Sequence, residues 1–411
     1  RALTPSSNGL EKRPKLRFPG FDEPYKQCRI GDIYAERSQR GASDMELLSV
    51  TMNDGVMPRS EIEGKDNSSE DKSNYKVVLT GDMVYNSMRM WQGANGISPC
   101  DGIVSPAYTV LMPKIPISNG YFAAFFKSPN LINEFRKNSQ GMTSDTWNLK
   151  YPQIETIKVC IPALSEQNRV ADMLRTLERR IAKQAQLVDN LKKYKRGLSS
   201  SLFDEISKSG CPTVSFADGF RLLQNNTFSR DDLSYDVGDV RNIHYGDVLI
   251  KYGTVTDIGA LSVPCIKPDR DIEKFSSSSY LRNGDIVFAD TAEDYTVGKA
   301  TEIVGVTNQR VLSGLHTIPC RPHDRFAPMF LGHYFNSYHF RRQIYRMIQG
   351  IKVSSISKSE IAKTTILTPP YDVQRKVASV LSEVDHLIEK EAETVIVLQK
   401  IRRGLLQQLF I

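Results

Sequence analysis

The most constraining feature of this 411-residue sequence is an internal repeat. Residues 159–203 align without a gap to residues 366–410, at an offset of 207 positions, and 16 of the 45 aligned pairs are identical. Because the offset is close to half the chain length, the sequence indicates two copies of one unit. Each copy is a variable region followed by the repeated segment.

Each repeated segment is predicted to form one long helix. Pro162 and Pro369 stand just before the expected helix starts, where proline is tolerated, and no proline follows Pro162 in the first segment or Pro370 in the second. Apolar residues recur at alternating spacings of three and four, which is the heptad pattern of a coiled coil. The predicted seam consists of Leu174, Leu177, Ile181, Val188, Leu191 and Leu198 in copy one, and of Leu381, Val384, Ile388, Val395, Leu398 and Leu405 in copy two.

Both copies interrupt this seam with polar residues at the same two places. Gln184 matches Glu391, and Lys195 matches Arg402. Polar seam residues weaken a coiled coil but specify its register, so the two helices are predicted to pair with each other. The alternative is that each helix is amphipathic and lies on its own globule, but the narrow seam and the length of the helices favour pairing.

The variable regions are predicted to be two α+β globules with the same plan. In each, an apolar run typical of a strand adjoins a Gly-Asp turn, at 81–82 and 284–285. An aromatic stretch predicted to be helical follows, at 121–135 and 330–344, and then a Gln-Gly pair. The predicted organisation is an N-terminal arm at 1–13, a first globule at 14–158, a first helix at 159–204, a linker at 205–211, a second globule at 212–365 and a second helix at 366–411.

This order of motifs resembles the specificity subunit of type I restriction-modification systems over essentially the whole chain. The resemblance is carried by Pro14–Phe21 (PKLRFPGF), Ile30–Ile33 (IGDI), the turns Gly81-Asp82 and Gly284-Asp285, and the helix start Ile161-Pro162 followed by Glu166 and Gln167. The resemblance implies two target-recognition domains and two long helices that pack antiparallel as a spacer. Copy two departs from the family pattern, because Val373 stands before Gln374 where glutamate is usual, and this puts any role of Glu166 in question.

The same resemblance implies the partners. Two modification subunits, with methyltransferase activity and S-adenosylmethionine as their cofactor, would bind around the helices, and restriction subunits would translocate and cleave DNA. The chain itself is expected to be non-catalytic, to hold no cofactor or metal, and to act on double-stranded DNA in the cytoplasm.

Two like globules on a rigid helix pair predict a bipartite DNA target with one half per globule. An unbroken helix of about 37 residues is about 55 Å long and a turn of B-DNA is about 34 Å, so half-sites roughly one turn apart fit the spacer. Because the variable regions differ in sequence, the target is expected to be asymmetric. A change in helix length is expected to alter the gap and to leave the bases that are read unchanged.

Base reading needs Arg or Lys for guanine, Asn or Gln for adenine, and apolar or hydroxyl groups for thymine, presented on loops. Polar segments of this kind follow the Gly-Asp strand and the Gln-Gly pair in each copy. The candidates in copy one are Arg89, Trp91, Gln92, Asn95, Thr143, Ser144, Trp147 and Asn148. The candidates in copy two are Lys251, Tyr252, Tyr295, Lys299, Lys352, Ser354 and Ser355. The alternative for any one of them is an ordinary solvated loop residue.

The formal net charge of +7 is concentrated in two places. Residues 1–17 carry +4, and residues 165–203 carry nine basic and four acidic side chains, or +5. The second helix is balanced, so the rest of the chain has no basic excess. We expect the basic helix, including Lys192, Lys193 and Lys195, to contact partner subunits or the DNA backbone of the gap and not to read bases.

Catalytic and membrane functions are not indicated. Residues 368–371 (TPPY) resemble the motif with which amino-methyltransferases hold a flipped base, but threonine lacks the required amide or carboxylate, and the copy-one counterpart is a helix start. No glycine-rich cofactor loop or Cys-x-x-Cys pair occurs, and His316, His323, His333 and His339 lack a metal-binding helix pattern. The longest aromatic-apolar run is six residues, which is too short for a membrane span.

The remaining alternative is a non-catalytic protein-interaction scaffold, which salt-dependent binding of duplex DNA would exclude.

Overall fold

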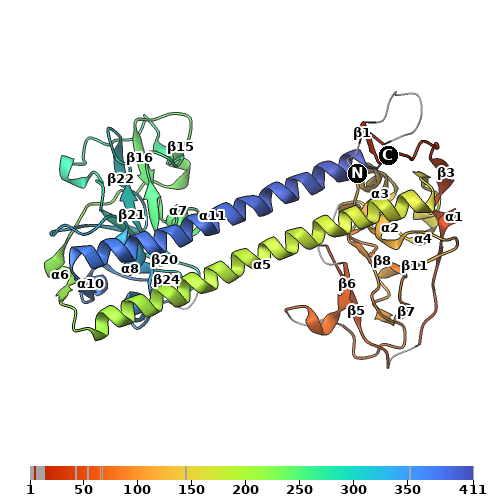
Figure 1. Ribbon diagram of the computed structural model, residues 1–411, viewed down its shortest axis with the longest axis horizontal. Helices are drawn as coiled ribbons and strands as arrows, with labels where there is room; N and C mark the ends of the chain where they lie inside the picture. Colours follow the sequence, from red (N-terminus) through yellow and green to blue (C-terminus); the bar gives the residue numbers. More distant parts are fainter. Residues whose placement is uncertain are drawn as a thin grey trace. The chain divides into compact units, whose positions relative to one another are not determined.

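The computed structural model describes residues 4–5, 14–41, 44–52, 55–64, 66, 68–143, 146–350 and 353–410. They form two compact units, one of residues 1–185 with 393–411 and the other of residues 186–392. Helices α5 (Leu164–Lys208) and α11 (Tyr371–Gln408) contribute a segment to each unit (Figure 1). Each unit therefore contains one globule and part of both long helices, and the predicted fold class is confirmed.

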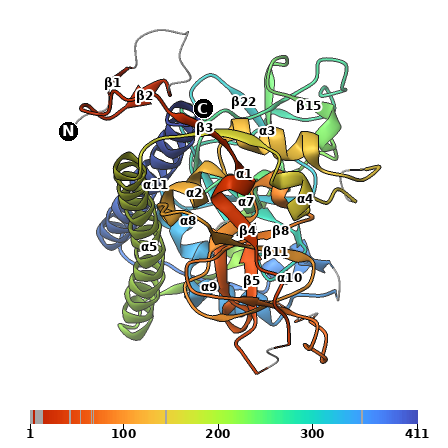
Figure 2. The same ribbon diagram turned by 90° about the vertical axis from the view of Figure 1, so that its right-hand side faces the viewer.

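The first globule is built on a four-stranded antiparallel sheet in the order β4-β11-β8-β9, of which β4, β11 and β8 are labelled in Figure 2. Strand β3 pairs with β12, β5 with β6, β7 with β10, and β1 with β2. The strands are β1 (Thr4–Pro5), β2 (Leu16–Arg17), β3 (Lys26–Arg29), β4 (Tyr34–Glu36), β5 (Leu48–Thr51), β6 (Gly55–Pro58), β7 (Lys76–Val78), β8 (Met83–Asn86), β9 (Asn95–Ile97), β10 (Gly102–Val104), β11 (Tyr108–Pro113) and β12 (Lys158–Ile161). The helices are α1 (Ile30–Ile33), α2 (Asn119–Phe125), α3 (Pro129–Asn138) and α4 (Tyr151–Ile154), with 3-10 turns η1 (Arg59–Glu61) and η2 (Met90–Gln92).

The second globule has a five-stranded sheet in the order β14-β23-β19-β21-β17 and a four-stranded sheet in the order β15-β18-β16-β22. Strand β13 pairs with β25, and β20 with β24. The strands are β13 (Thr213–Ser215), β14 (Phe220–Leu222), β15 (Leu233–Ser234), β16 (Val240–Ile243), β17 (Val255–Asp257), β18 (Cys265–Ile266), β19 (Ile286–Ala289), β20 (Thr291–Ala292), β21 (Ala300–Val304), β22 (Arg310–Ser313), β23 (Thr317–Pro322), β24 (Ser354–Ser355) and β25 (Thr365–Leu367). The helices are α6 (Phe216–Gly219), α7 (Tyr245–Ile250), α8 (Phe330–Asn336), α9 (Tyr338–Tyr345) and α10 (Lys358–Ile361), with η3 (Arg230–Asp232) and η4 (Ser277–Ser279).

The two globules share one plan well beyond the segment that aligns in sequence. The sheet order β4-β11-β8-β9 recurs as β14-β23-β19-β21, and the pair β3-β12 recurs as β13-β25. The Gly-Asp turn before the central strand is also shared, because Gly81 and Gly284 both adopt left-handed φ angles, of +90° and +89°. The aspartate that follows is buried and accepts hydrogen bonds from an arginine fork. The pairs are Asp82 with Arg37, at 2.6 and 3.1 Å, and Asp285 with Arg321, at 2.7 and 2.6 Å.

Each aromatic helical stretch is divided in two, although a single helix was predicted at 121–135 and at 330–344. The break falls at Ser128 in the first globule and at Ser337 in the second. Each serine is an N-cap whose hydroxyl accepts a backbone hydrogen bond, from Leu131 at 3.4 Å and from Phe340 at 3.3 Å. A serine side chain that satisfies a free N–H group starts a new helix in preference to continuing the old one.

The first long helix continues into the predicted linker at 205–211. It ends only at Lys208, so residues 205–208 are helical. Gly210 then adopts a φ of +75°, the left-handed conformation that commonly terminates helices. The linker between helix and second globule is correspondingly shorter than predicted.

Both globule cores are completed by the long helices. Phe410, at the end of α11, stacks on Phe125 with ring centroids 5.4 Å apart in the first core. Its repeat-related residue Phe203, near the end of α5, is buried in the second core. Leu174, near the start of α5, belongs to the first core, and Leu381, near the start of α11, belongs to the second. Each core thus contains the start of one long helix and the end of the other, so the helices run antiparallel.

The seam residues lie on the protected side of these helices. Between residues 174 and 198 of α5, all six predicted seam residues are buried or half-buried, and so are the polar positions Gln184 and Lys195. Ala185 is the one further position of this stretch that is not exposed. The six seam residues of α11 are likewise buried or half-buried.

A glutamine anchors the start of each long helix to its globule. The amide of Gln167 donates to the Pro162 carbonyl at 2.9 Å, and its oxygen accepts from the Ser118 N–H at 3.0 Å. Gln374 repeats this arrangement, with the Pro369 carbonyl at 2.8 Å and a second-globule backbone N–H at 2.9 Å. The two proline-glutamine helix starts are therefore equivalent in structure as well as in sequence.

Glu166 has a structural role in the first unit. Arg17 donates from Nε and Nη2 to its two carboxylate oxygens, both at 2.8 Å, and Tyr25 donates to it at 3.3 Å. The side chains of Arg17 and Glu166 are only 7% and 2% exposed. This buried ion pair holds the N-terminal segment against the start of α5, and Val373 cannot make an equivalent pair in the second unit.

We expect Glu166→Val to destabilise the protein by about 3–5 kcal/mol, because the buried Arg17 guanidinium loses its counter-charge. Urea unfolding of the full chain measures the change. The double variant Arg17→Met/Glu166→Val is the control and should regain most of the lost stability, since neither charge then remains buried. Equal losses in the single and double variants would contradict this account.

A second buried carboxylate lies at the start of α8. Glu302 of β21 is 2% exposed and accepts backbone hydrogen bonds from Met329 at 2.7 Å and from Gly332 at 2.9 Å. Burial raises the pKa of Glu302 to about 7, against an ordinary value of 4.5. The folded state therefore binds this proton more tightly than the unfolded state does.

This raised pKa predicts a pH dependence of stability. The contribution of protonated Glu302 is fully present below pH 4.5 and is lost as the pH rises through 7, by up to about 3 kcal/mol. The difference in unfolding free energy between the wild type and Glu302→Gln, measured from pH 4.5 to pH 8, should change across this window. A difference that stays constant would show that Glu302 does not titrate there.

Candidate nucleic-acid interface

In each globule the two segments predicted to read DNA lie next to each other. The residue after the central strand, Ser87 or Asp290, accepts a backbone hydrogen bond at 2.9 Å from the residue that follows the Gln-Gly loop, Leu149 or Ile356. In the second globule the contact extends into the strand pair β20-β24. Residues about 60 positions apart in sequence therefore form one surface in each copy.

The Gln-Gly loops share one backbone frame. Gln140 exchanges two backbone hydrogen bonds with Asn148, at 3.0 and 2.8 Å, and Gln349 exchanges two with Ser355, at 3.1 and 2.8 Å. The glycine that follows is required in both, since a Cβ would lie 2.6 Å from the Thr146 carbonyl oxygen at Gly141 and 1.9 Å from that of Val353 at Gly350. The frame explains the shared Gln-Gly pair, while the side chains that it presents differ.

An aromatic cluster joins the two segments of the first globule. The Trp91 ring packs edge-on against Trp147, with centroids 5.2 Å apart. The Trp91 indole N–H donates to the Met88 carbonyl at 3.0 Å, and the Arg136 guanidinium of α3 lies 5.8 Å from the Trp91 ring. Met142, in the same loop as Trp147, is 99% exposed. The result is an apolar aromatic surface with a positive charge, which suits contact with thymine methyl groups and phosphates of duplex DNA.

The other first-globule candidates fall into three groups. Arg89 and Thr143 are exposed, and Gln92 and Asn148 are half-buried, so all four border the aromatic cluster or its loop. Asn95 is fully buried in β9, with its amide donating to the Gly93 carbonyl at 3.1 Å, and its prediction as a base contact is corrected. Ser144 lies outside the described residues.

In the second globule Lys251 occupies an exposed position beside an aromatic ring. Its ammonium group lies 4.9 Å from the Tyr235 ring centroid and donates to the Tyr235 hydroxyl at 3.3 Å and to the Ser262 carbonyl at 2.7 Å. Tyr235 is 56% exposed, and Ile250, the neighbour of Lys251, is 90% exposed. This surface presents a cation, a phenol and an apolar side chain together.

Two second-globule candidates are structural. Tyr252 is 1% exposed and burial raises its pKa, so it cannot touch DNA in this conformation. Lys299 donates to the carbonyls of Leu249 and Tyr252 at 2.8 and 3.1 Å, and burial lowers its pKa. Lys299 thus holds the end of α7, and both predictions are corrected. These residues were predicted from their type alone. In the sequence, a lysine or tyrosine of a polar segment that faces solvent cannot be distinguished from one that is buried or caps a helix.

The remaining candidates that the structure describes reach the surface. Tyr295 is 77% exposed. Ser354 is half-buried and Ser355 exposed, both in β24. Lys352 lies outside the described residues.

Sequence reasoning missed one residue beside the second reading segment. His316 has a left-handed φ of +54° and is half exposed, and its Nδ1 lies 3.3 Å from Asp290 and 3.4 Å from the Thr291 hydroxyl. Arg136, Tyr235 and Ile250 were also missed. His316, Arg136 and Tyr235 reach the surface from elements other than the predicted segments, and Ile250 adjoins Lys251 but is apolar and was not considered as a base contact.

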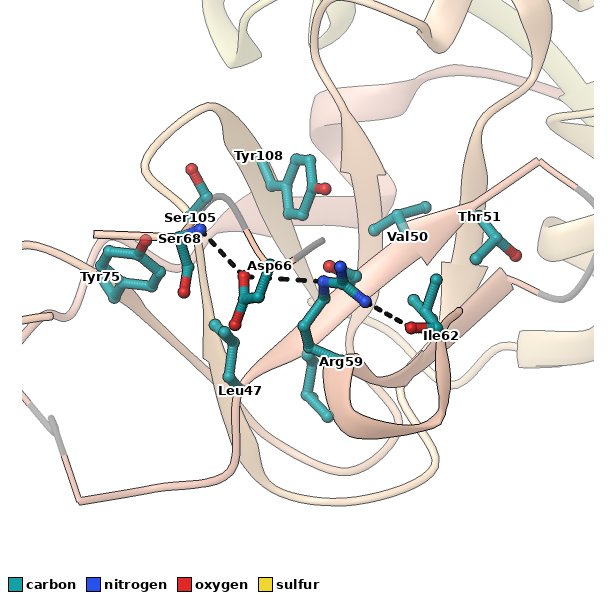
Figure 3. Close-up of a pocket in the computed structure, with 12 residues that line it drawn as sticks. Leu47, Val50, Thr51, Arg59, Ile62, Asp66, Ser68, Tyr75, Ser105 and Tyr108 are labelled. Carbon is teal, nitrogen blue, oxygen red and sulfur yellow. Dashed lines mark hydrogen bonds and ion pairs between the residues drawn. The ribbon is translucent and has the colours of Figure 1, made fainter. Parts of the chain in front are cut away.

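An open hollow of about 430 Å³ lies beside the β5-β6 hairpin (Figure 3). Arg59 crosses it, donating to the Ile62 carbonyl at 2.7 Å and lying 3.7 Å from Asp66. The backbone N–H of Ser68 lowers the pKa of Asp66. The charges that line the hollow therefore balance each other, and in the described part of the chain no three His, Cys, Asp or Glu side chains are placed to hold a metal. None of the helices described is both long and apolar enough to cross a membrane.

Comparisons with known proteins identify the fold. No family model matches the sequence. A chain from a structure of the complex assembly and conformational transition of the type I R-M system is 14% identical, with a TM-score of 0.58 over 94% of this chain and 97% of that chain. The S subunit of a type I restriction-modification system from M. genitalium is 12% identical, with a TM-score of 0.53 over 97% and 99%. The HsdS subunit from Thermoanaerobacter tengcongensis is 15% identical, with a TM-score of 0.50 over 98% and 99%.

The chain thus has the fold of type I restriction-modification specificity subunits. The likeness spans nearly the full length of both partners in each comparison. The resemblance inferred from the sequence motifs is confirmed at the level of the fold.

The aromatic cluster predicts a local effect on DNA binding. Trp91→Ala should weaken binding of the chain to duplex DNA about tenfold, because it removes the ring that joins both reading segments, a loss of about 1–1.5 kcal/mol. Tyr252→Phe is the matched control and should bind like the wild type, since the Tyr252 hydroxyl is buried. Electrophoretic mobility shifts measure both, and a larger loss for Tyr252→Phe than for Trp91→Ala would reverse the assignment.

Proposed function

We propose that this chain is the DNA-recognition subunit of a type I restriction-modification complex. The observation that carries the proposal is a common backbone frame that presents different side chains in the two globules. The tryptophans of the first surface have no counterpart beside Asp290 in the second, although the same backbone hydrogen bonds hold both segments. Two globules that present different side chains on the same backbone frame suit an asymmetric target, in which each globule reads one half. The fold likeness supports this role.

The partners follow from the proposed role. The chain carries no catalytic part of its own, and two adenine-specific modification subunits, which bind S-adenosylmethionine, together with restriction subunits, supply the chemistry. The exposed Lys192 and Lys193 of α5 are suited to contact a partner or the DNA backbone of the gap. Lys195 is not, because it is half-buried and ion-paired with Asp385, and the prediction for this residue is corrected.

The long helices would set the length of the gap. Their seam defines a single antiparallel register within each unit, which is the property required of a spacer. The apolar residues Tyr194, Ile396 and Val397 are 59%, 62% and 54% exposed on these helices. Such side chains favour a protein partner, and they are the observation that keeps a protein-interaction scaffold as the second candidate.

Expression of the chain with its cognate modification subunits tests the proposal. We expect methylated adenines to map to one bipartite, asymmetric sequence with a fixed gap, because each globule reads a separate half. Replacing residues 212–365 by the corresponding region of another specificity subunit should change one half of the motif and leave the other half unchanged. Duplex binding by the complex should fall steeply with salt, as phosphate contacts require.

The control is the modification subunits expressed alone. Random or absent methylation by a correctly assembled complex would contradict the proposal. Assembly with protein partners but without salt-dependent DNA binding would instead favour the scaffold.

A further inference from the structure

The two units contain the same ion pair between the long helices. Lys195 lies 2.5 Å from Asp385 in the second unit, and Arg402 lies 3.0 Å from Glu178 in the first. Each residue of one pair is related to a residue of the other by the repeat offset of 207. One of the two polar seam places recognised in the sequence, Lys195 and Arg402, therefore belongs to matched interhelical salt bridges.

The pairs differ in what else they contact. The Thr254 hydroxyl of the second globule donates to Asp385 Oδ2 at 3.1 Å. Nδ1 of His333, a residue of α8, lies 3.8 Å from the same oxygen, and Nε2 of His333 lies 3.0 Å from the Ser382 hydroxyl on α11. Asp385 thus joins α5, α11 and the second globule.

Glu178 makes no such connection. Its carboxylate is 53% exposed, against 28% for Asp385, and among the described residues its hydrogen bonds and ion pairs are those with Arg402. The pair in the first unit therefore holds the two helices together and leaves the first globule untouched. Glu178 is therefore a matched control for Asp385, because it makes the equivalent interhelical ion pair without a hydrogen bond to a globule.

The contacts of Asp385 with Lys195 and Thr254, called the Asp385 junction, are strengthened by charge and by the attachment of Thr254 to the main sheet. Burial lowers the pKa of His333 to about 4, so His333 is neutral at pH 7 and Lys195 alone balances the carboxylate. The carbonyl of Thr254 accepts from the Glu302 N–H at 3.0 Å, which ties this residue to strand β21 of the main sheet. A rotation of the globule about α11 would break a charge-assisted hydrogen bond in a half-buried position.

The charged contacts of the two units also differ at the repeat position of Val373. The first globule is tied to its long helix by the buried Arg17–Glu166 pair, and valine removes that possibility from the second. The second globule has a charged connection at Asp385, one helix turn beyond Leu381. These charged connections therefore fall at different points of the repeat, and in the second unit His339 of α9 also lies 3.3 Å from Asp204 of α5.

We propose that Asp385, through Thr254, is a positioning residue that fixes the rotation of the second globule about the helix pair and thereby sets which gap length the complex accepts. This inference rests on the proposed function. Asp385 acts without touching DNA, so it affects the spacing of the half-sites and leaves the choice of bases within each half unchanged.

Three variants of the full chain, assembled with its cognate modification subunits, test the inference. Asp385→Asn weakens the whole junction, Thr254→Val removes only the bond to the globule, and Glu178→Gln weakens only the matched interhelical pair. Methylation rates are measured on duplexes with the native gap and with gaps one base pair shorter and longer. We expect Asp385→Asn and Thr254→Val to raise the rate on altered gaps relative to the native gap by about three- to tenfold, as loss of one hydrogen bond allows. Glu178→Gln should keep the wild-type ratio.

A merely structural role predicts another outcome. Thermal unfolding would then show a lower midpoint for Asp385→Asn while the gap discrimination of the folded complex stayed as in the wild type, and this result would overturn the proposal. So would an equal loss of discrimination in Glu178→Gln.

Failure of the proposed function is a separate result. If the wild-type chain directs no bipartite methylation, hydrogen exchange of the isolated full chain still tests the junction. Exchange across residues 254–257 should be faster in Asp385→Asn and Thr254→Val than in Glu178→Gln, and equal exchange in all three would overturn the positioning role.

Discussion

The structure depends on the packing of two antiparallel helices that complete both globule cores. Phe410 and Leu174 fill the first core, and the repeat-related Phe203 and Leu381 fill the second. Burial of each such side chain contributes about 1.5–3 kcal/mol, so neither globule is expected to be stable without helix segments from both halves of the chain. This shared burial makes each globule depend on both halves of the repeated sequence.

The repeat is most instructive where its copies differ. The glutamines at the helix starts make the same hydrogen bonds in both copies, whereas Glu166 and Val373 do not match. The interhelical ion pairs match, but only Asp385 extends to a globule. The reading segments share backbone bonds and differ in side chains. Features shared by the two copies thus form the common fold. Features found in only one copy are where the two halves of the chain differ in their contacts.

Much of the fold could be predicted because it rests on periodic burial. The heptad spacing identified the helix pair and its polar seam positions, and the Gly-Asp turns identified the central strands. The break at Ser128 was missed. The sequence does carry a signal for it, because Pro129 is tolerated in the first turn of α3 but not inside one continuous helix. The helical residues 205–208 were missed because glutamate, isoleucine, serine and lysine there permit either state until packing decides.

The candidate surface was predicted as segments, and its individual residues were not. Sequence order alone located the two loops in each copy, and the Gln-Gly pair followed from a turn that excludes any Cβ. Only the tertiary structure decided that Trp91 meets Trp147, that Asn95 and Tyr252 face the interior, and that Lys299 caps α7. By itself the sequence determined a doubled α+β chain with a paired helical spacer, since periodicity and repetition are properties of the chain. Side-chain exposure depends on contacts between distant residues, and for that reason the reading residues and the Asp385 junction emerged only in three dimensions.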